Sequence, residues 1–539
     1  MSVSSGSIIK SRRDSLPAPG SVFFCVLCWQ GPQTTDSEHL APGSADMASV
    51  QEGHRLSFVA VLFGGDLLGE VCIDCWFVGL GLTWVQDMKP FTVDALSVAM
   101  TLFTGFGYIV GIPLSTALGR RPVVLAASAI TTGATLWAGV AGSFYQLLFS
   151  LCLQALATGA AIGMFILIII DATYIHERPN ALSLYWCVGS VFIKLAILLF
   201  PITTDLTNNW RQMYLVWFAF AVSAFVLILL FVPETFFLRP PVALDGRVLV
   251  QSGSEKVEVY EAWEEIELVN SERPLPDLPR GRMWNRIWGR ISIKRAPGTE
   301  WKAWVATYMQ MALCIVNPLT FWVSLLTGVI LSGVISIFLT QPGALIGLWH
   351  QDPQHVSIML GVMGIIGSIL AFPATGPLAC WFTRRQSLRT AGGIRHAELY
   401  LPIFALPVVS GLLSLIINGL AIKNQWHPAC LYIVSVLSIF SYLTGNVAFT
   451  LWITEAFPRW AAAALAVQLF TGNMVSFGIG TAIMPWCSKQ DIVPPTLIIG
   501  GLMLVLGVLA VPAAFWGQTV RQYIHGRWSD SEKGALRPQ

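Results

Sequence analysis

The stretch LSLYWCVGSVFIKLAILLF, residues Leu182 to Phe200, is long and apolar enough to cross a membrane. A bilayer-spanning helix needs about 20 mainly apolar residues, and Lys194 is the only residue here that should not dissolve in lipid. The apolar run is continuous rather than alternating, which indicates a helix and not a barrel strand. This stretch therefore predicts a membrane-spanning helix with one charge inside it.

Similar runs recur along the chain, and we count twelve of them. They cover residues 57–84, 95–117, 122–142, 147–170, 182–202 and 213–233, and then 317–340, 356–382, 400–421, 429–452, 460–486 and 496–516. The chain is 55% hydrophobic and 12% charged, whereas soluble domains carry about 25% charged residues. These observations predict an all-α polytopic membrane protein with twelve transmembrane helices in two six-helix halves.

The distribution of basic residues indicates how the chain is oriented in the membrane. Of its 32 Lys and Arg, the predicted outer loops hold only Lys89, Arg211, Lys423 and Lys489. Apart from Lys194, all the others fall on the inner side if both termini are cytoplasmic. The positive-inside rule favours this arrangement. Net charge is only +2, so no nucleic-acid partner is expected.

Five segments follow from these spans. We expect a cytoplasmic N-terminal tail without fixed structure at 1–55, an N-terminal half at 56–238, a cytoplasmic central loop at 239–307, a C-terminal half at 308–516 and a cytoplasmic tail at 517–539. Within the central loop, Trp284, Ile287, Trp288 and Ile291 share one helical face, and Arg282, Arg286 and Arg290 share another. This pattern is typical of a basic amphipathic helix on an anionic inner leaflet. The alternative is a solvated linker with scattered tryptophans.

The two halves also resemble each other in sequence. The second span ends in PLSTALGRR, residues 113–121, and the eighth ends in PLACWFTRR, residues 377–385. Proline, leucine and the arginine pair fall at identical spacing and at matching positions within each half. Internal repeats of this kind are common in secondary transporters, whose binding sites lie between the repeats near mid-membrane.

Several further motifs occur in the order found in one known family. They are GRRPVVL from Gly119, DATYIHERPNALSLYW from Asp171, NWRQMY from Asn209, FVPETFF from Phe231 and GGIRHAELYLP from Gly392. With these motifs, residues 57 to 525 resemble the major facilitator superfamily, in particular its fungal drug:proton antiporter branch with twelve helices. The resemblance implies secondary transport of a small organic solute by alternating access. It further implies proton-coupled efflux of drug-like or amine compounds, in the plasma membrane or, alternatively, the vacuolar membrane.

Three positions depart from the pattern of that branch. Thr116 stands at the acidic position of the loop motif, and Leu151 stands where the R-x-x-Q-G motif of the fourth helix has arginine. The antiporter motif G-P-x-x-G-G is replaced by ILLFPI at residues 197–202. Proton coupling is thereby left open, and two alternatives remain, namely a proton-independent facilitator and a solute receptor that transports nothing.

The intramembrane charges are the leading candidates for the binding site. A charge at the bilayer centre costs at least ~2.5–3.5 kcal/mol, and such charges usually face protein or a water-filled cavity. The first span carries Asp66, Glu70 and Asp74 on one helical stripe. A pair of Lys194 with Glu70 or Asp74 would lower the cost of both charges and could carry a proton. A static ion pair is the alternative, as is an interfacial position for Asp66.

Further candidates follow from the resemblance, because the fourth and tenth helices line the cavity in that fold. Gln154 and Asn446 are then substrate-site candidates, and Trp322, like Trp76 and Trp186, could stack on a substrate. Packing is the competing interpretation for the tryptophans, and helix-to-helix hydrogen bonding is expected for Gln468 and Asn473. For gating, the candidates are Arg120, Arg121, Arg384, Arg385, Asp171 and Glu234. Purely topogenic charge is the alternative for the arginines.

Catalytic motifs do not point to an enzyme. The sequence contains neither a GxxxxGK[ST] phosphate loop nor a nucleophile–base constellation, and its histidines fall in tails, loops or span ends. We therefore expect no enzymatic activity, no cofactor and no metal. The expected partners are a small organic solute, the lipid bilayer and, if transport is coupled, protons, and the chain is expected to act as a monomer.

Overall fold

The structure is a computed structural model that describes residues 93–173, 177–203, 210–232, 242–244, 247–251, 257–260, 301–390, 397–457 and 460–517. The first predicted span, with Asp66, Glu70 and Asp74, lies outside these residues. So do the predicted amphipathic helix near Trp284 and the gating candidate Glu234. All other predicted spans are helical in the part of the chain that the structure describes.

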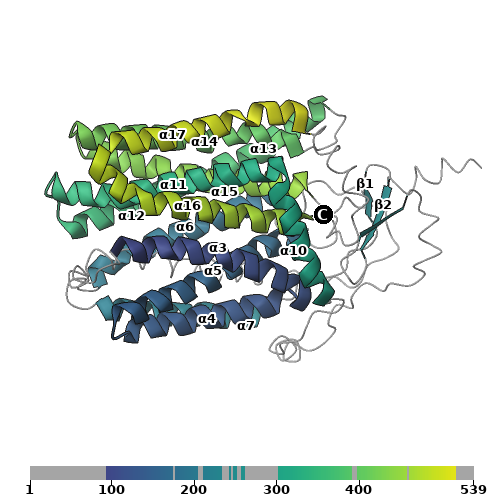
Figure 1. Ribbon diagram of the computed structural model, residues 1–539, viewed down its shortest axis with the longest axis horizontal. Helices are drawn as coiled ribbons and strands as arrows, with labels where there is room; N and C mark the ends of the chain where they lie inside the picture. Colours follow the sequence, from purple (N-terminus) through teal and green to yellow (C-terminus); the bar gives the residue numbers. More distant parts are fainter. Residues whose placement is uncertain are drawn as a thin grey trace, which may run out of the picture.

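The helices of the first half lie side by side, as the ribbons in Figure 1 show. They are α3 (Val93–Leu118), α4 (Arg120–Val140), α5 (Phe144–Ala172), α6 (Arg178–Thr203) and α7 (Trp210–Phe231). Their continuous apolar sequences favour helices in lipid, where every backbone polar group needs a partner within its own segment. At the start of α5, the Ser143 side chain caps the helix by accepting a hydrogen bond from the backbone N–H of Gln146.

The second half repeats this arrangement. Its elements are α11 (Pro318–Gly347), α12 (Pro353–Thr375), α13 (Pro377–Thr390), the 3₁₀ helix η2 (Ala397–Phe404), α14 (Ala405–Lys423), α15 (Ala429–Ala456), α16 (Ala461–Gln490) and α17 (Val493–Val508). The predicted eighth span, 356–382, is interrupted at Gly376. Because Pro377 has no backbone N–H, it starts a new helix more readily than it continues an old one.

Between the halves, the structure contains elements that the sequence did not predict. The strands β1 (Val242–Leu244), β2 (Arg247–Gln251) and β3 (Val257–Tyr260) form an antiparallel sheet, with Val248 paired to Tyr260. Helix α10 (Trp301–Val316) then crosses the predicted boundary between loop and half at residue 308. Figure 1 shows α10 lying across one end of the helix bundle, with the sheet beyond it. We call this end of the helix bundle the α10 end and the opposite end the far end.

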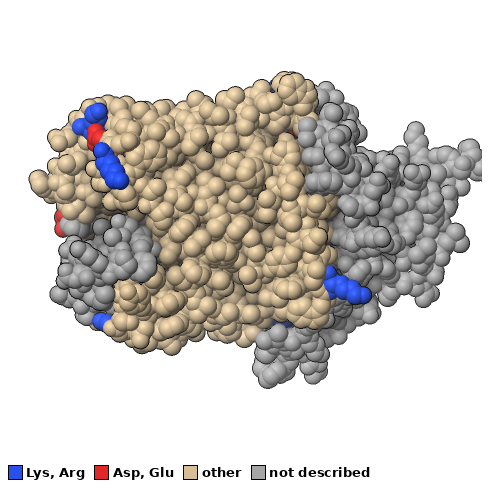
Figure 2. Space-filling view, in the orientation of Figure 1, with Lys and Arg blue, Asp and Glu red and all other residues tan. Residues whose placement is uncertain are grey.

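Ten helices in the described residues are long and apolar enough to cross a membrane. Helix α6, with its internal lysine, adds a further 26-residue apolar helix. Figure 2 shows the charged residues of this face near the two ends of the bundle, with a broad uncharged surface between them. This distribution matches a bilayer core of ~30 Å between two polar interfaces.

Close packing within the first half depends on glycines of α3. A Cβ atom on Gly107 would lie 2.2 Å from the carbonyl oxygen of Leu156, and one on Gly111 would lie 2.6 Å from the Cβ of Ala160. Only glycine lets α3 and α5 approach so closely. These two glycines therefore form a close-packing surface on α3.

Two antiparallel helix pairs join the halves to each other. Helix α6 packs against α12, and α3 packs against α16. We call these contacts the α6–α12 seam and the α3–α16 seam. Any relative movement of the two halves must alter one or both of them.

Candidate functional site

Lys194 lies on α6 where that helix meets α12. Its position is ~24 Å along the helix from Arg178 at 1.5 Å per residue, and its side chain is half-buried. The aliphatic stem passes directly over Gly364 of α12, where an added Cβ would lie 2.9 Å from Lys194 Cδ. Glycine at position 364 thus makes room for the lysine within the α6–α12 seam.

A cavity of about 40 Å³ adjoins Lys194 on the far-end side of the bundle. Residues of α6, α11, α12 and α15 line it, and its polar members besides Lys194 are Gln341, Ser435 and Ser438. Gln341 donates to the carbonyl oxygen of Leu431 at 2.6 Å, and the Ser435 hydroxyl donates to Gln341 Oε1 at 2.9 Å. A cavity of this size has room for a few water molecules where polar groups reach it. An amine, an amide and two hydroxyls thus share a lining that is otherwise apolar.

Hydroxyl pairs continue this polar character along the α6–α12 seam. Ser368 donates to Ser190 at 2.8 Å, and Ser183 pairs with Thr375 at 2.8 Å. These four residues were not predicted from the sequence, because single hydroxyls are common within spans. One signal could have revealed them: each helix carries its two hydroxyls two helical turns apart, on one face.

Asn446 and Trp186 lie where α6 meets α15. The Asn446 side chain donates to the carbonyl oxygen of Tyr442 at 2.9 Å, within its own helix. The ring of Tyr442 meets that of Trp186 edge-on, with centroids 6.2 Å apart. The indole N–H of Trp186 is buried and has no hydrogen-bond acceptor among the described residues. This cluster is the second polar feature between the halves.

Gln154 and Trp322 lie within the two halves rather than between them. Gln154 donates from α5 to Thr135 of α4 at 3.1 Å. The indole of Trp322 donates to the carbonyl oxygen of Leu506 at 2.8 Å and stacks on Phe404. These contacts hold neighbouring helices together, and neither residue lines the cavity around Lys194.

Gln468 and Asn473, both expected to join helices, make different kinds of hydrogen bond. Gln468 of α16 donates to Thr327 of α11 at 3.2 Å, which confirms its predicted role between helices. The Asn473 side chain donates to the carbonyl oxygen of Leu469 in its own helix.

Two of the predicted gating residues meet at the α10 end. Arg120 is buried, with Nη1 donating to Ser115 Oγ at 2.7 Å and Nε lying 3.4 Å from a carboxylate oxygen of Asp171. Arg121 donates to the carbonyl oxygen of Leu229 on α7 at 2.9 Å. The buried charge of Arg120 is thus compensated, and both arginines tie helices of the first half together.

The arginine pair of the second half has a different environment. Arg384 and Arg385 are exposed, and the Arg385 guanidinium lies over the ring of Trp381, 5.1 Å from its centroid. The two halves therefore share the arginine pair in sequence but not in burial.

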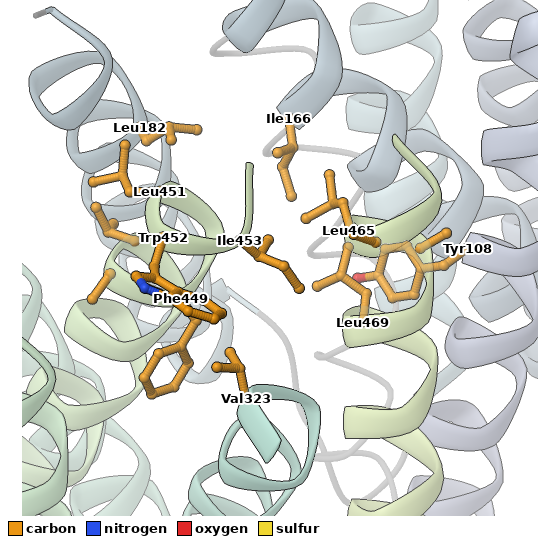
Figure 3. Packing of buried hydrophobic residues seen from close by; sticks show 14 of the residues in the cluster. Tyr108, Ile166, Leu182, Val323, Phe449, Leu451, Trp452, Ile453, Leu465 and Leu469 are labelled. Atoms are coloured by element: carbon orange, nitrogen blue, oxygen red, sulfur yellow. The ribbon is translucent and has the colours of Figure 1, made fainter. Parts of the chain in front are cut away.

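The α10 end of the bundle is closed by apolar side chains from both halves. Ile166 of α5 and Leu182 of α6 belong to the same buried cluster as Ile453 of α15 and Leu465 of α16 (Figure 3). The cavity beside Lys194 lies nearer the far end, and Ile337 of the same cluster forms part of its lining. A solute in the cavity would therefore have to part these apolar residues to leave through the α10 end.

Taken together, the helices, the apolar surface and the seams define an integral multi-pass membrane protein of the all-α class. Comparison with known proteins identifies the family. Residues 71–481 match the family described as the Major Facilitator Superfamily. This match covers most of the chain, so the protein belongs to the Major Facilitator Superfamily. The expected family and fold class are thereby confirmed.

Individual proteins show more limited similarity. A region of 160 residues is 30% identical to the "Probable transporter AQR1" of Saccharomyces cerevisiae (strain ATCC 204508 / S288c), covering 28% of this chain and 26% of that protein. In structure, the chain is similar to the MFS proton:xylose symporter XylE bound to 6-bromo-6-deoxy-D-glucose. The TM-score is 0.55 at 14% identity, over 86% of this chain and 95% of that chain. This second similarity concerns the fold alone.

Proposed function

We propose that the protein is a secondary transporter that moves a small organic solute across the membrane by alternating access. The observation that carries the proposal is the position of Lys194, a cation at a cavity beside the α6–α12 seam that Gln341 and Ser435 also line. Intramembrane charges at such positions are usually functional. A site between the two halves can face either side of the membrane as the halves rock.

The size of the cavity supports a requirement for such movement. Sites for drug-sized molecules measure about 300–1,000 Å³, whereas the cavity beside Lys194 is about 40 Å³. Solute binding would therefore need the α6–α12 seam to part. Its hydroxyl pairs favour this, because water can replace each hydroxyl partner when the seam opens.

For the substrate, we propose a drug-like or amine compound, exported with proton coupling. The acidic stripe of Asp66, Glu70 and Asp74 suits a cation, and Lys194 would act as the counter-charge of a titrating carboxylate. In this scheme, Gln154, Asn446 and Trp322 shape the site indirectly. The α10 end is cytoplasmic, the protein resides in the plasma membrane as a monomer, and the Arg120–Asp171 pair stabilises the closed inner gate.

A proton-independent facilitator is the second candidate, and two positions favour it. Leu151, where the resembling branch has arginine, is buried and carries no charge. Thr116, which replaces an acid, pairs with the hydroxyl of Thr307 at 3.2 Å. A neutral hydroxyl pair cannot carry the charge that an acidic residue would supply at this position.

The experiment is solute accumulation in a transporter-depleted fungal host that expresses the chain. The panel holds polyamines, cationic drugs and organic acids, each at two external pH values. Wild type is compared with Lys194→Ala and Glu70→Gln, and with Gly478→Ala as a matched control, because a Cβ at Gly478 meets no atom within 4 Å. We expect the accumulation of one solute to change, in a pH-dependent manner, in cells that express wild type or the control. It should not change in cells that express either charge variant.

Each other outcome contradicts a defined part of the proposal. If transport persists in both charge variants, Lys194 has only a structural role. If transport is lost in Lys194→Ala but does not depend on pH, the facilitator is correct. If no solute moves although the protein reaches the membrane, the transporter proposal fails for the classes in the panel.

A further inference from the structure

Helix α10 has two contrasting faces, although Lys302 is its only charged residue. Five residues spaced by three or four positions form one exposed stripe, here called the α10 stripe. They are Trp301, Val305, Met309, Ala312 and Val316. Met309 and Val316 are 66% and 74% exposed, which is unusual for large apolar side chains. The opposite face is buried.

The buried face of α10 contacts both halves of the protein. Thr307 pairs with Thr116 of α3 through their hydroxyls, and Tyr308 donates its phenol proton to the carbonyl oxygen of Ile109 at 3.1 Å. Burial raises the pKa of Tyr308, so the phenol stays protonated and remains a donor. Helix α10 also packs against α16 of the second half. It therefore lies across the α3–α16 seam, on the side of the α10 end.

Water is an unfavourable environment for the α10 stripe, since each exposed large apolar side chain forgoes the free energy that burial would give. Figure 1 shows α10 running across the end of the membrane-spanning helices, as a helix in the plane of the membrane interface would. The uncharged surface of the bundle continues up to this end in Figure 2. The α10 stripe thus adjoins the lipid interface at this end of the bundle.

Charge and aromatic residues point to the same partner. Trp301 and Trp304 stand at the start of α10, and tryptophan prefers the membrane–water interface. The chain leading into α10 is strongly basic, with Arg280, Arg282, Arg286, Arg290, Lys294 and Arg295. Anionic lipids of an inner leaflet attract such residues electrostatically.

From these observations, we propose that α10 is an interfacial helix that inserts the α10 stripe into the anionic inner leaflet while its other face grips α3 and α16. The helix would then connect the membrane surface directly to the seam between the halves. This proposal goes beyond the transport function, because it concerns a lipid-binding surface and holds whether or not a solute moves.

The test measures the depth of α10 in reconstituted full-length protein. A fluorescent label is attached to Met309→Cys in a cysteine-depleted chain, in vesicles of phosphatidylcholine and phosphatidylserine. Quenching by lipids with a nitroxide near the headgroup is compared with quenching by aqueous iodide. We expect lipid nitroxides to remove most of the fluorescence and iodide to remove little, because interfacial helices bury their apolar face ~5–10 Å deep.

Arg385→Cys provides the matched control, since Arg385 is exposed on α13 and should be quenched by iodide. Val305→Cys repeats the measurement on the stripe if the first label disturbs folding. Strong iodide quenching at position 309 would show that the stripe faces water and would overturn the proposal. Protection from both quenchers would also overturn it, because the stripe would then be covered by protein, either the central loop or a second copy.

Discussion

The two seams that join the halves differ in chemistry, although both are antiparallel helix pairs. The α6–α12 seam is polar, with the Ser190–Ser368 and Ser183–Thr375 pairs and the lysine stem over Gly364. The α3–α16 seam is mainly apolar, and its Asn473 side chain bonds within its own helix and not across the seam. There, the rings of Phe106 and Phe470 lie 5.8 Å apart, and Gly105 and Gly480 admit side chains of the facing helix.

This difference predicts which seam opens to water. Hydroxyl pairs can exchange their partners for water at little cost, whereas exposing packed rings forfeits the hydrophobic gain of their burial. We therefore expect the solute path to open along the α6–α12 seam, with the α3–α16 seam staying closed as a pivot. The cavity beside Lys194 lies on the polar seam, as this interpretation requires.

The largest expected effect comes from locking each seam with a disulfide. The first double variant is Ser183→Cys with Thr375→Cys in a cysteine-depleted chain. Oxidation of this pair to a disulfide should reduce transport to the background level, because the α10 end can no longer open. Gly105→Cys with Asn473→Cys locks the apolar seam, where the two Cβ positions are 3.1 Å apart, slightly less than the ~3.5–4.5 Å between the Cβ atoms of a disulfide. This second lock should leave most of the transport intact.

Initial rates before and after oxidation, and after reduction, measure both effects. Cys187 must be replaced, because its sulfur lies 3.9 Å from Ser183 Oγ. Unchanged transport in the oxidised Ser183–Thr375 variant, or loss of transport in the Gly105–Asn473 variant, would reverse the roles assigned to the two seams.

A smaller effect is expected from filling the space beneath Lys194. Gly364→Val forces the lysine stem aside, and overpacking of this kind costs ~1–3 kcal/mol, so we expect the transport rate to fall about tenfold. Gly478→Val on α16 is the matched control, because that position is open. Its rate should stay within about twofold of wild type, as for most substitutions away from packed sites. Equal rates for the two variants, at equal amounts of folded protein, would argue against a role for the lysine's position.

The sequence predicted the membrane class and the helices well and singled out Lys194 as a candidate, because each has a local signature. An apolar run of membrane length is recognisable by itself, and one lysine within it is conspicuous. The cavity could not be predicted in the same way. Gln341 and Ser435 are far apart in sequence and meet only because α11 packs against α15, so their role depends on tertiary structure.

Other features were missed for different physical reasons. Helix α10 has an almost uncharged sequence that is too short to span a membrane, so the sequence analysis divided it between loop and helix. The strands β1 to β3 occur in a polar insert where charge pattern dominated the interpretation. Gln154 was chosen by its position in the family pattern, whereas its contact with Thr135 depends on how α5 is rotated against α4.

The smallest expected effects are the coupling energies of single side-chain pairs across the two seams. A double-mutant cycle with Ser190→Ala and Ser368→Ala should give ~0.6 kcal/mol, the average for hydrogen bonds between membrane helices. The corresponding cycle with Phe106→Leu and Phe470→Leu should give ~0.5–1.5 kcal/mol, as for other aromatic pairs. Reversible denaturation of the purified protein in mixed micelles measures both. A hydroxyl coupling clearly larger than the aromatic coupling would mean that the polar seam is the more firmly closed of the two. The α3–α16 seam would then be the better candidate for the one that opens, and the position of Lys194 would have to be explained as a structural bridge between closed helices.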